Sequence, residues 1–408
     1  MKLKKTAQFF IVRIIRIADA LRIFAIKTFV TLGVKRKFRI LFLVNDNTKW
    51  NAQSVFEVFR KDPRFDARIF VCRQEQSESE KKTRNGYAED CAFFRKRNIP
   101  FIPGYDESIK KDIPVSSYSP DLVFYIQPWG WTRKLYDLTT IRKKSLTAYI
   151  PYSLPICNDP NDNQLTFHQL ITFFYVPSAI SLKLNQKEML NKGKNCVVSG
   201  YPKLDDYAKP VQKTKNQPKI LYAPHHSFSG RLRFATFRWN GREMLEYARR
   251  HSEISWVFKP HPRLKYELVE QKIMTLEEAN DYYDSWASMD NSEFYNSGDY
   301  IRLFQESDLL ITDCISFLGE YLPSGNPVIL LENTESAGYN ELGKEIISSY
   351  YSCKAWNEVE MAIERIVIKK QDPLNEIRNN TLDRVYLKKS SSKMIYEHIV
   401  NTFFNRIG

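Results

Sequence analysis

Short apolar runs alternate with helical stretches along most of this chain, and this alternation limits the folds that it can adopt. The first six runs are rich in β-branched and aromatic residues and cover 37–45, 66–73, 99–102, 121–127, 145–150 and 195–199. Helical stretches are expected near 51–60 and 80–97, between the early runs. Strands separated by helices predict βαβ units and a parallel sheet, and hence an α/β fold.

A second alternating region follows a break at 203–218. The break, KLDDYAKPVQKTKNQP, is polar, contains two prolines and lacks apolar periodicity, so we expect a linker. Beyond it, we expect strands at 219–223, 255–259, 308–312 and 327–331, helices near 240–251 and 315–322, and one or two helices over 374–405. The aromatic and acidic stretch 263–300 does not fit the alternation and is expected to be a helical insertion.

A chain of 408 residues is long enough to bury two cores. The predicted organisation is a basic helix, a first domain, a linker, a second domain and C-terminal helices, at 1–36, 37–202, 203–218, 219–372 and 373–408. Two parallel-sheet domains joined by a linker imply a cleft between them. Ligands of such sheets bind outside the carboxyl ends of the strands, so the residues just after each strand are the candidates for chemistry.

Most of the net charge lies at the N-terminus. The first 37 residues hold ten Lys or Arg and one acid, which is +9 of the +14 carried by the whole chain. Apolar residues such as Phe9, Ile14 and Leu21 lie between these charges, and this pattern predicts an amphipathic helix on an anionic membrane surface. The charges interrupt the apolar residues well short of the ~20 that a spanning helix needs. The alternative is a helix packed on the protein's own core, with its charges in water.

Several classes of function lack their sequence signature. Charges beyond the basic head are nearly balanced and no nucleic-acid-binding module is present, so no nucleic-acid partner is expected. The six cysteines include no CxxC pair, which argues against a zinc ribbon or a disulfide framework and fits a reducing, cytoplasmic compartment. GxGxxG, GxxxxGK[ST] and GxSxG motifs are absent. Without a pair of acidic metal ligands at a strand end, we expect metal-independent transfer and no cofactor.

Three strand ends in the second domain carry chemically active side chains. They are the runs 223–227, 259–263 and 312–321, which follow three successive predicted strands of that domain. The candidate site residues in these runs are His225, His226, His261, Arg263, Thr312, Asp313, Ser316 and Glu320.

A phosphate site is the chemistry that these residues fit best. The turn after the third strand offers backbone N–H groups and the hydroxyls of Thr312 and Ser316 to an anion. His261 and Arg263 can add hydrogen-bond donors to a diphosphate, and Glu320 can accept from ribose hydroxyls. These roles together predict a nucleotide diphosphate donor.

The paired histidines of the first strand end are the candidates for catalysis. His225 or His226 can act as a general acid or base, or can steady a leaving phosphate. The alternative is structural, because Asp313 and Ser316 are common helix-capping types and any single buried histidine can simply be hydrogen-bonded in place. The recurrence of such residues at three strand ends of one domain favours the functional interpretation.

The first domain offers a weaker candidate site, for the molecule that accepts the group transferred from the donor. The runs 127–131 and 149–153 follow predicted strands and contain Trp129 and Tyr152. Aromatic rings and hydroxyls suit an acceptor, but Pro and Gly turns at strand ends are common, so the two interpretations stand side by side.

The motifs of the second domain resemble those of the CDP-glycerol glycerophosphotransferase family, which makes teichoic acids and some capsules. The similar runs are YAPHHS, FKPHP, GDYIRLFQESDLLITD and SFLGEYLPSGNPVILL, at 222–227, 258–262, 298–313 and 316–331, and GYPKLD at 200–205 resembles the lead into the linker. The resemblance covers roughly 220–335 well and the first domain weakly.

The resemblance implies a GT-B fold of two Rossmann-like domains, a CDP-linked donor bound mainly by the second domain, and association with the inner membrane face. By motif match, His261, Thr312, Asp313 and Ser316 would bind the donor's phosphates, and Glu320 would bind the ribose or the phosphates.

Two departures from the family pattern bear on the chemistry. The family's Trp-His-Gly stretch, which supplies a catalytic histidine in the first domain, corresponds here to 149–153 (YIPYS), which has no histidine. The usual Asp-Tyr-Ser-Ser is Asp-Cys-Ile-Ser at 313–316 and lacks one hydroxyl. The catalytic base is then His225 or His226, or the donor differs from the one that the family uses.

Three functions remain open on the sequence alone. The first is transfer of glycerol phosphate, or a similar polyol phosphate, from a CDP-linked donor to a lipid-linked or glycan acceptor. The second is a GT-B glycosyltransferase that uses a nucleotide sugar. The third is a non-catalytic binding protein of the membrane surface.

Overall fold

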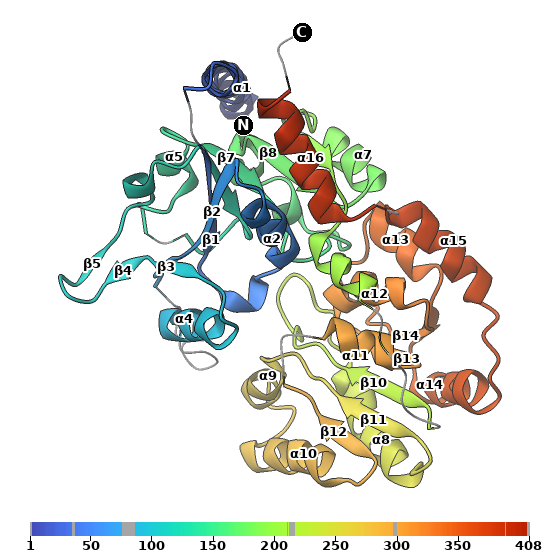
Figure 1. Cartoon of the computed structure of the whole chain (residues 1–408). Coiled ribbons are helices and arrows are strands. Elements are labelled where there is room, and N and C mark those ends of the chain that lie inside the picture. Colours follow the sequence, from blue (N-terminus) through green and yellow to red (C-terminus); the bar gives the residue numbers. More distant parts are fainter. Residues whose placement is uncertain are drawn as a thin grey trace. The chain divides into compact units, whose positions relative to one another are not determined.

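The computed structural model describes residues 2–34, 37–75, 86–131, 133–209, 211, 217–296, 300–387 and 389–405, with side chains from residue 10 onward. The chain forms two compact units (Figure 1). Unit 1 comprises 1–153, 160–205 and 387–408, and unit 2 comprises 154–159 and 206–386. Each unit contains a parallel sheet with helices, so the predicted α/β fold with two Rossmann-like domains is confirmed.

Unit 1 is built on a parallel sheet of seven strands. Its order is β3-β2-β1-β6-β7-β8-β9, with bounds Phe101–Pro103, Phe65–Val71, Phe38–Val44, Leu122–Tyr125, Leu146–Tyr149, Phe173–Val176 and Cys196–Val198. A two-stranded hairpin, β4 (Tyr105–Asp106) and β5 (Lys111–Asp112), extends from this unit (Figure 1). Strands β1, β6 and β7 are buried almost throughout, as expected for a parallel sheet covered on both faces.

The helices of unit 1 cover both faces of its sheet. They are α1 (Lys2–Thr31), α2 (Gln53–Lys61), α4 (Gly86–Lys96), α5 (Leu138–Ile141), α6 (Thr166–Leu170), α7 (Ala179–Glu188) and α16 (Ser391–Phe403). Short 3-10 turns lie at η1 (Asn47–Lys49), η2 (Val115–Tyr118) and η3 (Pro160–Asp162), and η4 (Pro202–Ala208) spans the boundary between the units. The C-terminal helix α16 packs beside α1 and α2.

Unit 2 repeats the architecture with six parallel strands. Their order is β12-β11-β10-β13-β14-β15, with bounds Ser292–Phe294, Ser255–Phe258, Lys219–Ala223, Leu309–Thr312, Val328–Leu331 and Tyr351–Cys353. The helices are α8 (Phe237–Arg250), α9 (Leu264–Glu270), α10 (Leu276–Ser288), α11 (Ile301–Glu306), α12 (Ile315–Tyr321), α13 (Glu341–Ile347), α14 (Trp356–Ile363) and α15 (Asn375–Val385), with a 3-10 turn η5 (Leu322–Ser324) and a π-helical segment η6 (Glu364–Ile368).

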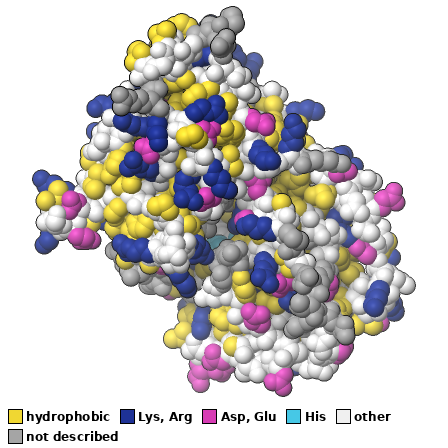
Figure 2. All heavy atoms as spheres, viewed as in Figure 1, with side chains coloured by type: hydrophobic (Ala, Val, Ile, Leu, Met, Phe, Trp, Pro, Cys, Tyr) yellow, Lys and Arg dark blue, Asp and Glu magenta, His cyan; other side chains and the backbone are white. Residues whose placement is uncertain are grey.

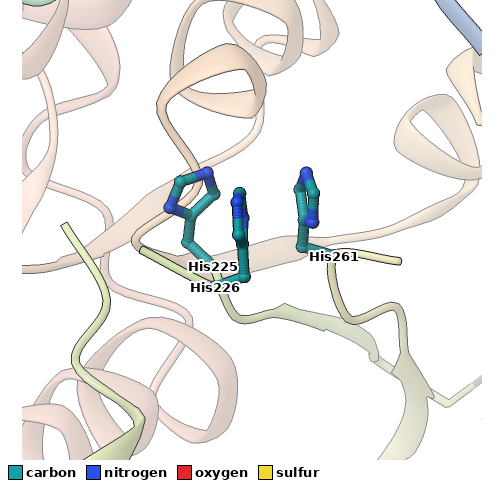
Figure 3. A group of neighbouring side chains, drawn as sticks. All are labelled: His225, His226 and His261. Atoms are coloured by element: carbon teal, nitrogen blue, oxygen red, sulfur yellow. The ribbon is translucent and has the colours of Figure 1, made fainter. Parts of the chain in front are cut away.

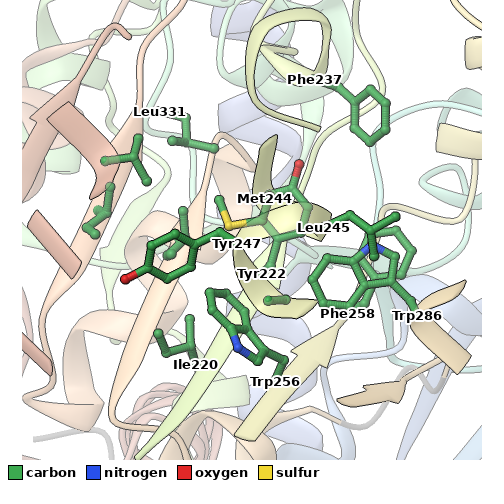
Figure 4. Packing of buried hydrophobic residues seen from close by; sticks show 14 of the residues in the cluster. Ile220, Tyr222, Phe237, Met244, Leu245, Tyr247, Trp256, Phe258, Trp286 and Leu331 are labelled. Carbon is green, nitrogen blue, oxygen red and sulfur yellow. The ribbon is translucent and has the colours of Figure 1, made fainter. Parts of the chain in front are cut away.

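An aromatic core holds one face of the unit 2 sheet to its helices (Figure 4). Trp256 and Phe258 of β11 are fully buried, and Trp286 of α10 stacks on Phe258 with ring centroids 5.1 Å apart. Helix α10 begins at a capping box in which Thr275 and Glu278 satisfy each other's backbone N–H groups. The cap and the buried aromatic face together fix α10 against β11 and β12.

The strand order reverses once in each sheet. In unit 1 the chain passes outward from β1 through β2 to β3, and β6 then pairs on the other side of β1. In unit 2 the chain passes from β10 through β11 to β12, and β13 pairs on the other side of β10. In doubly wound sheets, ligands bind at the carboxyl ends of the strands that flank such a reversal. Each unit therefore has one topological switch point.

Several predicted elements differ from the structure. The stretch 263–300 is not only a helical insertion, because α9 and α10 lead to the edge strand β12. Strands β8 and β15 were not predicted. Part of the helix expected at 80–97 and part of the linker expected at 203–218 lie outside the described residues. The C-terminal helices divide, because α15 belongs to unit 2 and α16 to unit 1.

Helix α1 is attached to unit 1 through charged side chains. Arg16 donates to the carbonyl oxygens of Gln169, Ile171 and Thr172 at 3.0, 2.5 and 3.1 Å, and Arg22 donates to three carbonyls near α5. Asp19 is 4% exposed and pairs with Arg142 at 3.0 Å. Arg16, Asp19 and Arg22 thus lie on the side of α1 that faces the protein.

The opposite side of α1 is apolar and open. Phe10, Ile14, Ile17, Leu21 and Phe24 recur at helical spacing and are each more than half exposed. Hydrophobic side chains lie at the surface over this helix in Figure 2. Among the described helices, none has a stretch long and apolar enough to cross a membrane.

Candidate functional site

Three histidines come together at the carboxyl ends of β10 and β11 (Figure 3). His225 and His226 follow β10, and His261 follows the neighbouring β11. The rings of His226 and His261 stack with centroids 3.8 Å apart, and the His225 ring lies 4.5 Å from that of His226. The register of β10 and β11 places both strand ends at the same edge of the sheet, so the predicted cluster forms from residues 35 positions apart.

Backbone contacts fix the tautomers of two of these rings. The N–H of Arg263 donates to Nδ1 of His261 at 3.1 Å, and the N–H of Ser227 donates to Nδ1 of His225 at 3.4 Å. The Ser227 hydroxyl accepts from the N–H of Phe234 at 3.0 Å and lies 2.8 Å from the same His225 nitrogen. Because Nδ1 accepts in both neutral rings, the proton of each ring is on Nε2. Each ring therefore offers an Nε2–H donor.

The three imidazoles are neutral near pH 7. Burial lowers the pKa of His225 and of His261 well below the usual range, and the neighbouring histidines lower both further. Burial, followed by the charge of Arg263, lowers the pKa of His226 to about 4. Nδ1 of His226 is a buried nitrogen without a hydrogen-bond partner among the described residues. An incoming group is therefore free to use it.

Two cations flank the histidine cluster. Lys259 is 7% exposed, and its Nζ lies 5.3 and 5.1 Å from the ring centroids of Tyr295 and Tyr300. Arg263 pairs with Glu267 at 2.6 Å and keeps a buried Nε without a partner among the described atoms. Both positive charges depress the pKa of His261. The electrostatic environment of the cluster therefore favours an anion.

The spacing of the cluster also fits a metal ion, since ligand nitrogens of His225, His226 and His261 all lie within 4.8 Å of one another. The position of the proton on the rings of His225 and His261 argues against a metal ion. A metal at Nε2 of His225 or His261 would require moving the proton to Nδ1, which would break the bond from the backbone N–H. Adjacent Lys259 and Arg263 would repel a cation as well. The donor set suits phosphate oxygens better.

Asp313 holds the loop of the histidine pair in place. Its carboxylate accepts from the N–H of His225 at 2.6 Å, and from the N–H and hydroxyl of Thr236 at 2.6 and 2.7 Å. The side chain is 1% exposed, and burial raises its pKa to about 6. The Thr312 hydroxyl donates to the carbonyl of Ala223 at 2.6 Å and ties β13 to β10. Both side chains are thus engaged within the protein, where they position the strand ends.

Ser316 and Glu320 lie on α12, directly after β13. Ser316 is half-buried, with its hydroxyl 3.6 Å from Sγ of Cys314, so it lies nearer the surface than Thr312 or Asp313. Glu320 is 1% exposed, and its carboxylate accepts a hydrogen bond from the Tyr300 hydroxyl. Of these two residues, Ser316 is the more accessible to a ligand.

Some members of the site were not singled out from the sequence. Ser227 and Thr236 act through the contacts described above, and buried Lys259 lies between the aromatic rings of Tyr295, Tyr300 and Phe317. Lys259 opens the KPHPR run at a strand end, so its place in the sequence was a usable signal. Thr236 lies in an irregular stretch before α8, where no sequence pattern indicates a partner for Asp313.

The two aromatic candidates of the first domain lie in contact within unit 1. The rings of Trp129 and Tyr152 meet edge to face with centroids 5.7 Å apart. They follow β6 and β7, which are neighbours in the sheet. Nζ of Lys49 lies 5.5 Å from the Tyr152 ring.

No protein-family model matches this sequence, and no curated protein matches it. Solved structures of similar fold include a putative UDP-N-acetylglucosamine 2-epimerase from Listeria monocytogenes, 12% identical with a TM-score of 0.59, covering 90% of this chain and 97% of the other. The corresponding epimerase from Neisseria meningitidis, bound to UDP-GlcNAc, is 13% identical with a TM-score of 0.57, covering 90% and 100%.

A wall teichoic acid polymerase, the H444N variant of TagF, is 12% identical with a TM-score of 0.57, covering 98% of this chain and 96% of the other. At these identities the likeness concerns the fold, and it extends over nearly the full length of both chains. The chain therefore has the two-unit, GT-B-like α/β fold that these enzymes share.

Proposed function

We propose that this chain is a membrane-associated transferase of cell-surface polymer synthesis. It moves glycerol phosphate, or a similar polyol phosphate, from a CDP-linked donor to a lipid-linked or glycan acceptor. The observation that carries the proposal is the cluster of His225, His226 and His261 at the switch point of unit 2, where neutral N–H donors and two cations suit a diphosphate.

The structural neighbours support a nucleotide-linked donor. One neighbour is the teichoic acid polymerase TagF after a soak with CDPG, 11% identical with a TM-score of 0.56. Others are UDP-GlcNAc 2-epimerases bound to UDP-GlcNAc, or to UDP-GlcNAc and UDP. The sequence runs that resemble the CDP-glycerol glycerophosphotransferase family favour the CDP-linked donor over a UDP-sugar.

The proposed reaction is an in-line displacement at phosphorus. An acceptor hydroxyl forms a bond to the β-phosphorus, the bond from that phosphorus to the bridging oxygen breaks, and CMP leaves. His226 takes the hydroxyl proton at its unpartnered Nδ1, and the Nε2–H groups of His225 and His261 hydrogen-bond to the phosphates. Ser316 and Arg263 add donors from the neighbouring strand ends.

A donor screen by calorimetry tests this proposal. We expect CDP-glycerol or CDP-ribitol to bind more tightly than UDP-GlcNAc or CMP-sialic acid, and His261→Ala to weaken binding at least ~10-fold, which is about 1.4 kcal/mol. His251→Ala is the matched control, because His251 ends α8 and bonds to Glu253 away from the strand ends. Preference for a UDP-sugar would assign the chain to the glycosyltransferases. Absence of nucleotide binding would favour the non-catalytic binding protein.

The exposed side of α1 supports the membrane part of the proposal. Its buried charges attach the helix to unit 1, so Phe10, Ile14, Ile17, Leu21 and Phe24 stay exposed without any rearrangement. Exposed Arg13 provides a charge for anionic headgroups, and the first 37 residues of the sequence hold ten Lys or Arg in all.

Flotation with vesicles tests the membrane contact. We expect Ile14→Ser with Leu21→Ser to reduce binding to phosphatidylglycerol vesicles several-fold, while the thermal midpoint stays nearly unchanged because both side chains are exposed. The control is Ile109→Ser with Leu135→Ser, which removes two exposed apolar side chains elsewhere in unit 1. Equal vesicle binding by both double variants would contradict the assignment of this surface to the membrane.

A further inference from the structure

A second row of polar side chains lies at the switch point of unit 1. Leu43 of β1, Tyr125 of β6 and Tyr149 of β7 are in register, so Asn45, Gln127 and Pro151 follow them at one level on three adjacent strands. Adjacent strands are ~4.8 Å apart, which makes these residues immediate neighbours. Asn45 and Gln127 are 0% and 1% exposed, so two buried amides lie where the strand order reverses.

Backbone carbonyls fix the orientation of these amides. Nδ2 of Asn45 donates to the carbonyl of Gly130 at 3.1 Å and to Oε1 of Gln74 at 2.8 Å. Oδ1 of Asn45 must then face Gln127, whose Nε2 donates to it at 2.7 Å. This leaves Oε1 of Gln127 as a buried acceptor without a partner among the described residues.

Asn51 repeats the pattern beside the third strand. Its Nδ2 donates to the carbonyl of Pro151 at 2.5 Å, and a carbonyl can only accept. Oδ1 of Asn51 is therefore the second buried acceptor without a partner among the described residues, and the side chain is 6% exposed. Leaving such a group unsatisfied costs ~1–3 kcal/mol, so two at one switch point call for a ligand or for ordered water.

A glycine permits this arrangement. Gly130 has a φ of +77°, and a Cβ there would lie 3.0 Å from Nε2 of Gln127 and 3.1 Å from Oε1 of Gln74. Any larger residue would strain the backbone and press on the amides. Trp129, 36% exposed, precedes this glycine and meets Tyr152 edge to face. The row of amides thus adjoins an accessible aromatic pair.

We infer that the Asn51–Gln127 amides and the Trp129–Tyr152 pair form a binding site for a neutral, hydroxyl-bearing group, a polyol or a sugar unit. Two unpartnered oxygens need donors, and hydroxyls supply them. A cationic ligand is disfavoured because Asp46, the nearby acid after β1, already accepts from Thr48 and pairs with Lys49 at 3.1 Å. The aromatic pair offers an apolar face to the carbon side of such a ligand. The further step, that this site holds the acceptor of a transferase, rests on the function proposed above.

Binding of simple probes tests the inference independently of donor chemistry. By saturation-transfer NMR, we expect ribitol and methyl β-D-glucopyranoside to bind and 1-propanol and tetrahydropyran, which lack the hydroxyl set, to bind far less. Gln127→Met removes the free oxygen at nearly constant volume and is expected to weaken ribitol binding at least ~10-fold. CDP-glycerol affinity, measured on the same variant, is expected to change less than about twofold, because the donor site is in unit 2.

The matched control is Gln169→Met. Gln169 is also a buried amide of unit 1, 3% exposed, but lies on α6 before the amino end of β8, and both ends of its amide are hydrogen-bonded. We expect it to lower stability without changing ribitol binding. Trp129→Ala serves if Gln127→Met does not fold, since Trp129 is partly exposed, and it should weaken ribitol binding as well.

Unchanged ribitol binding in both Gln127→Met and Trp129→Ala, or equal binding of 1-propanol, would overturn the inference and leave ordered water as the partner of these oxygens. If the variants lose ribitol binding but the wild-type protein binds no nucleotide, the binding site in unit 1 is supported and the proposed transferase function is refuted.

Discussion

His168 is a buried histidine whose ring has no polar partner. It is 0% exposed, stacks on Phe174, and neither ring nitrogen has a hydrogen bond among the described residues. Burial lowers its pKa from 6.5 to about 3. Between these values the unfolded chain binds a proton that the native chain does not, so the free energy of unfolding falls as the pH is lowered from 6.5.

We expect His168→Leu to stabilise the protein. The variant removes two unsatisfied nitrogens, which should raise the free energy of unfolding by about 1 kcal/mol at pH 7. It also removes the loss of stability below pH 6.5, which is up to about 1.4 kcal/mol per pH unit. Urea unfolding at pH 7 and pH 5 measures both effects. His398→Leu is the contrast, because Nδ1 of His398 bonds to the Tyr175 hydroxyl at 2.9 Å and its loss should destabilise at pH 7. Equal changes in stability for both variants would contradict the view that the His168 ring lacks polar partners while the His398 ring is hydrogen-bonded.

The buried carboxylate of Asp313 organises the loop that carries His225. We expect Asp313→Ala to cost about 3 kcal/mol, because three buried donors on His225 and Thr236 lose their acceptor. Nitrogen-15 NMR of the histidine rings should then report loss of the fixed Nε2–H tautomer of His225. A stability loss with the His225 tautomer retained would limit Asp313 to a purely structural role.

Helix α1 is held to unit 1 by the buried Asp19 and its arginine partners as well as by apolar residues such as Val12, while a second apolar set stays exposed. We expect Arg16→Met to destabilise unit 1 by about 2 kcal/mol, since three buried carbonyls lose their donor and Asp19 loses an ion-pair partner. Differential scanning fluorimetry measures the loss. Arg13→Met, on an exposed position of the same helix, is the control and should change the midpoint little. Similar midpoints for both would mean that α1 is not held by its polar contacts.

Long apolar runs were predictable as strands, and short edge strands were not. β1, β10 and β14 are mainly apolar and almost fully buried, which is a signal that sequence alone carries. β12 and β15 have three residues each and are only partly buried, and they are defined by pairing with β11 and β14. β8, an aromatic run of four buried residues, had a usable signal but follows a short helix that obscured the alternation.

At the scale of the whole molecule, the two units have separate aromatic and aliphatic cores. We expect Trp256→Ala to cost unit 2 about 3–5 kcal/mol, because it empties the space beside Tyr247 and Trp286. Hydrogen exchange should quicken in β10, β11 and β13 while β1, β6 and β7 keep their protection. Exchange that quickens equally in both sheets would mean that the units unfold as one.

The α/β class was predictable from the amino-acid sequence, and so were the two successive sheets and the strand ends at which polar residues gather. These follow from local periodicity and from runs such as YAPHHS and KPHPR, which need no knowledge of distant contacts. The contacts that each residue makes there depend on the tertiary fold. It placed His261 on His226, turned Asp313 inward to Thr236, and left Gln127 and Asn51 with open acceptors. Hydrogen-bond partners and burial arise from pairing between strands far apart in the chain, and no local pattern encodes them.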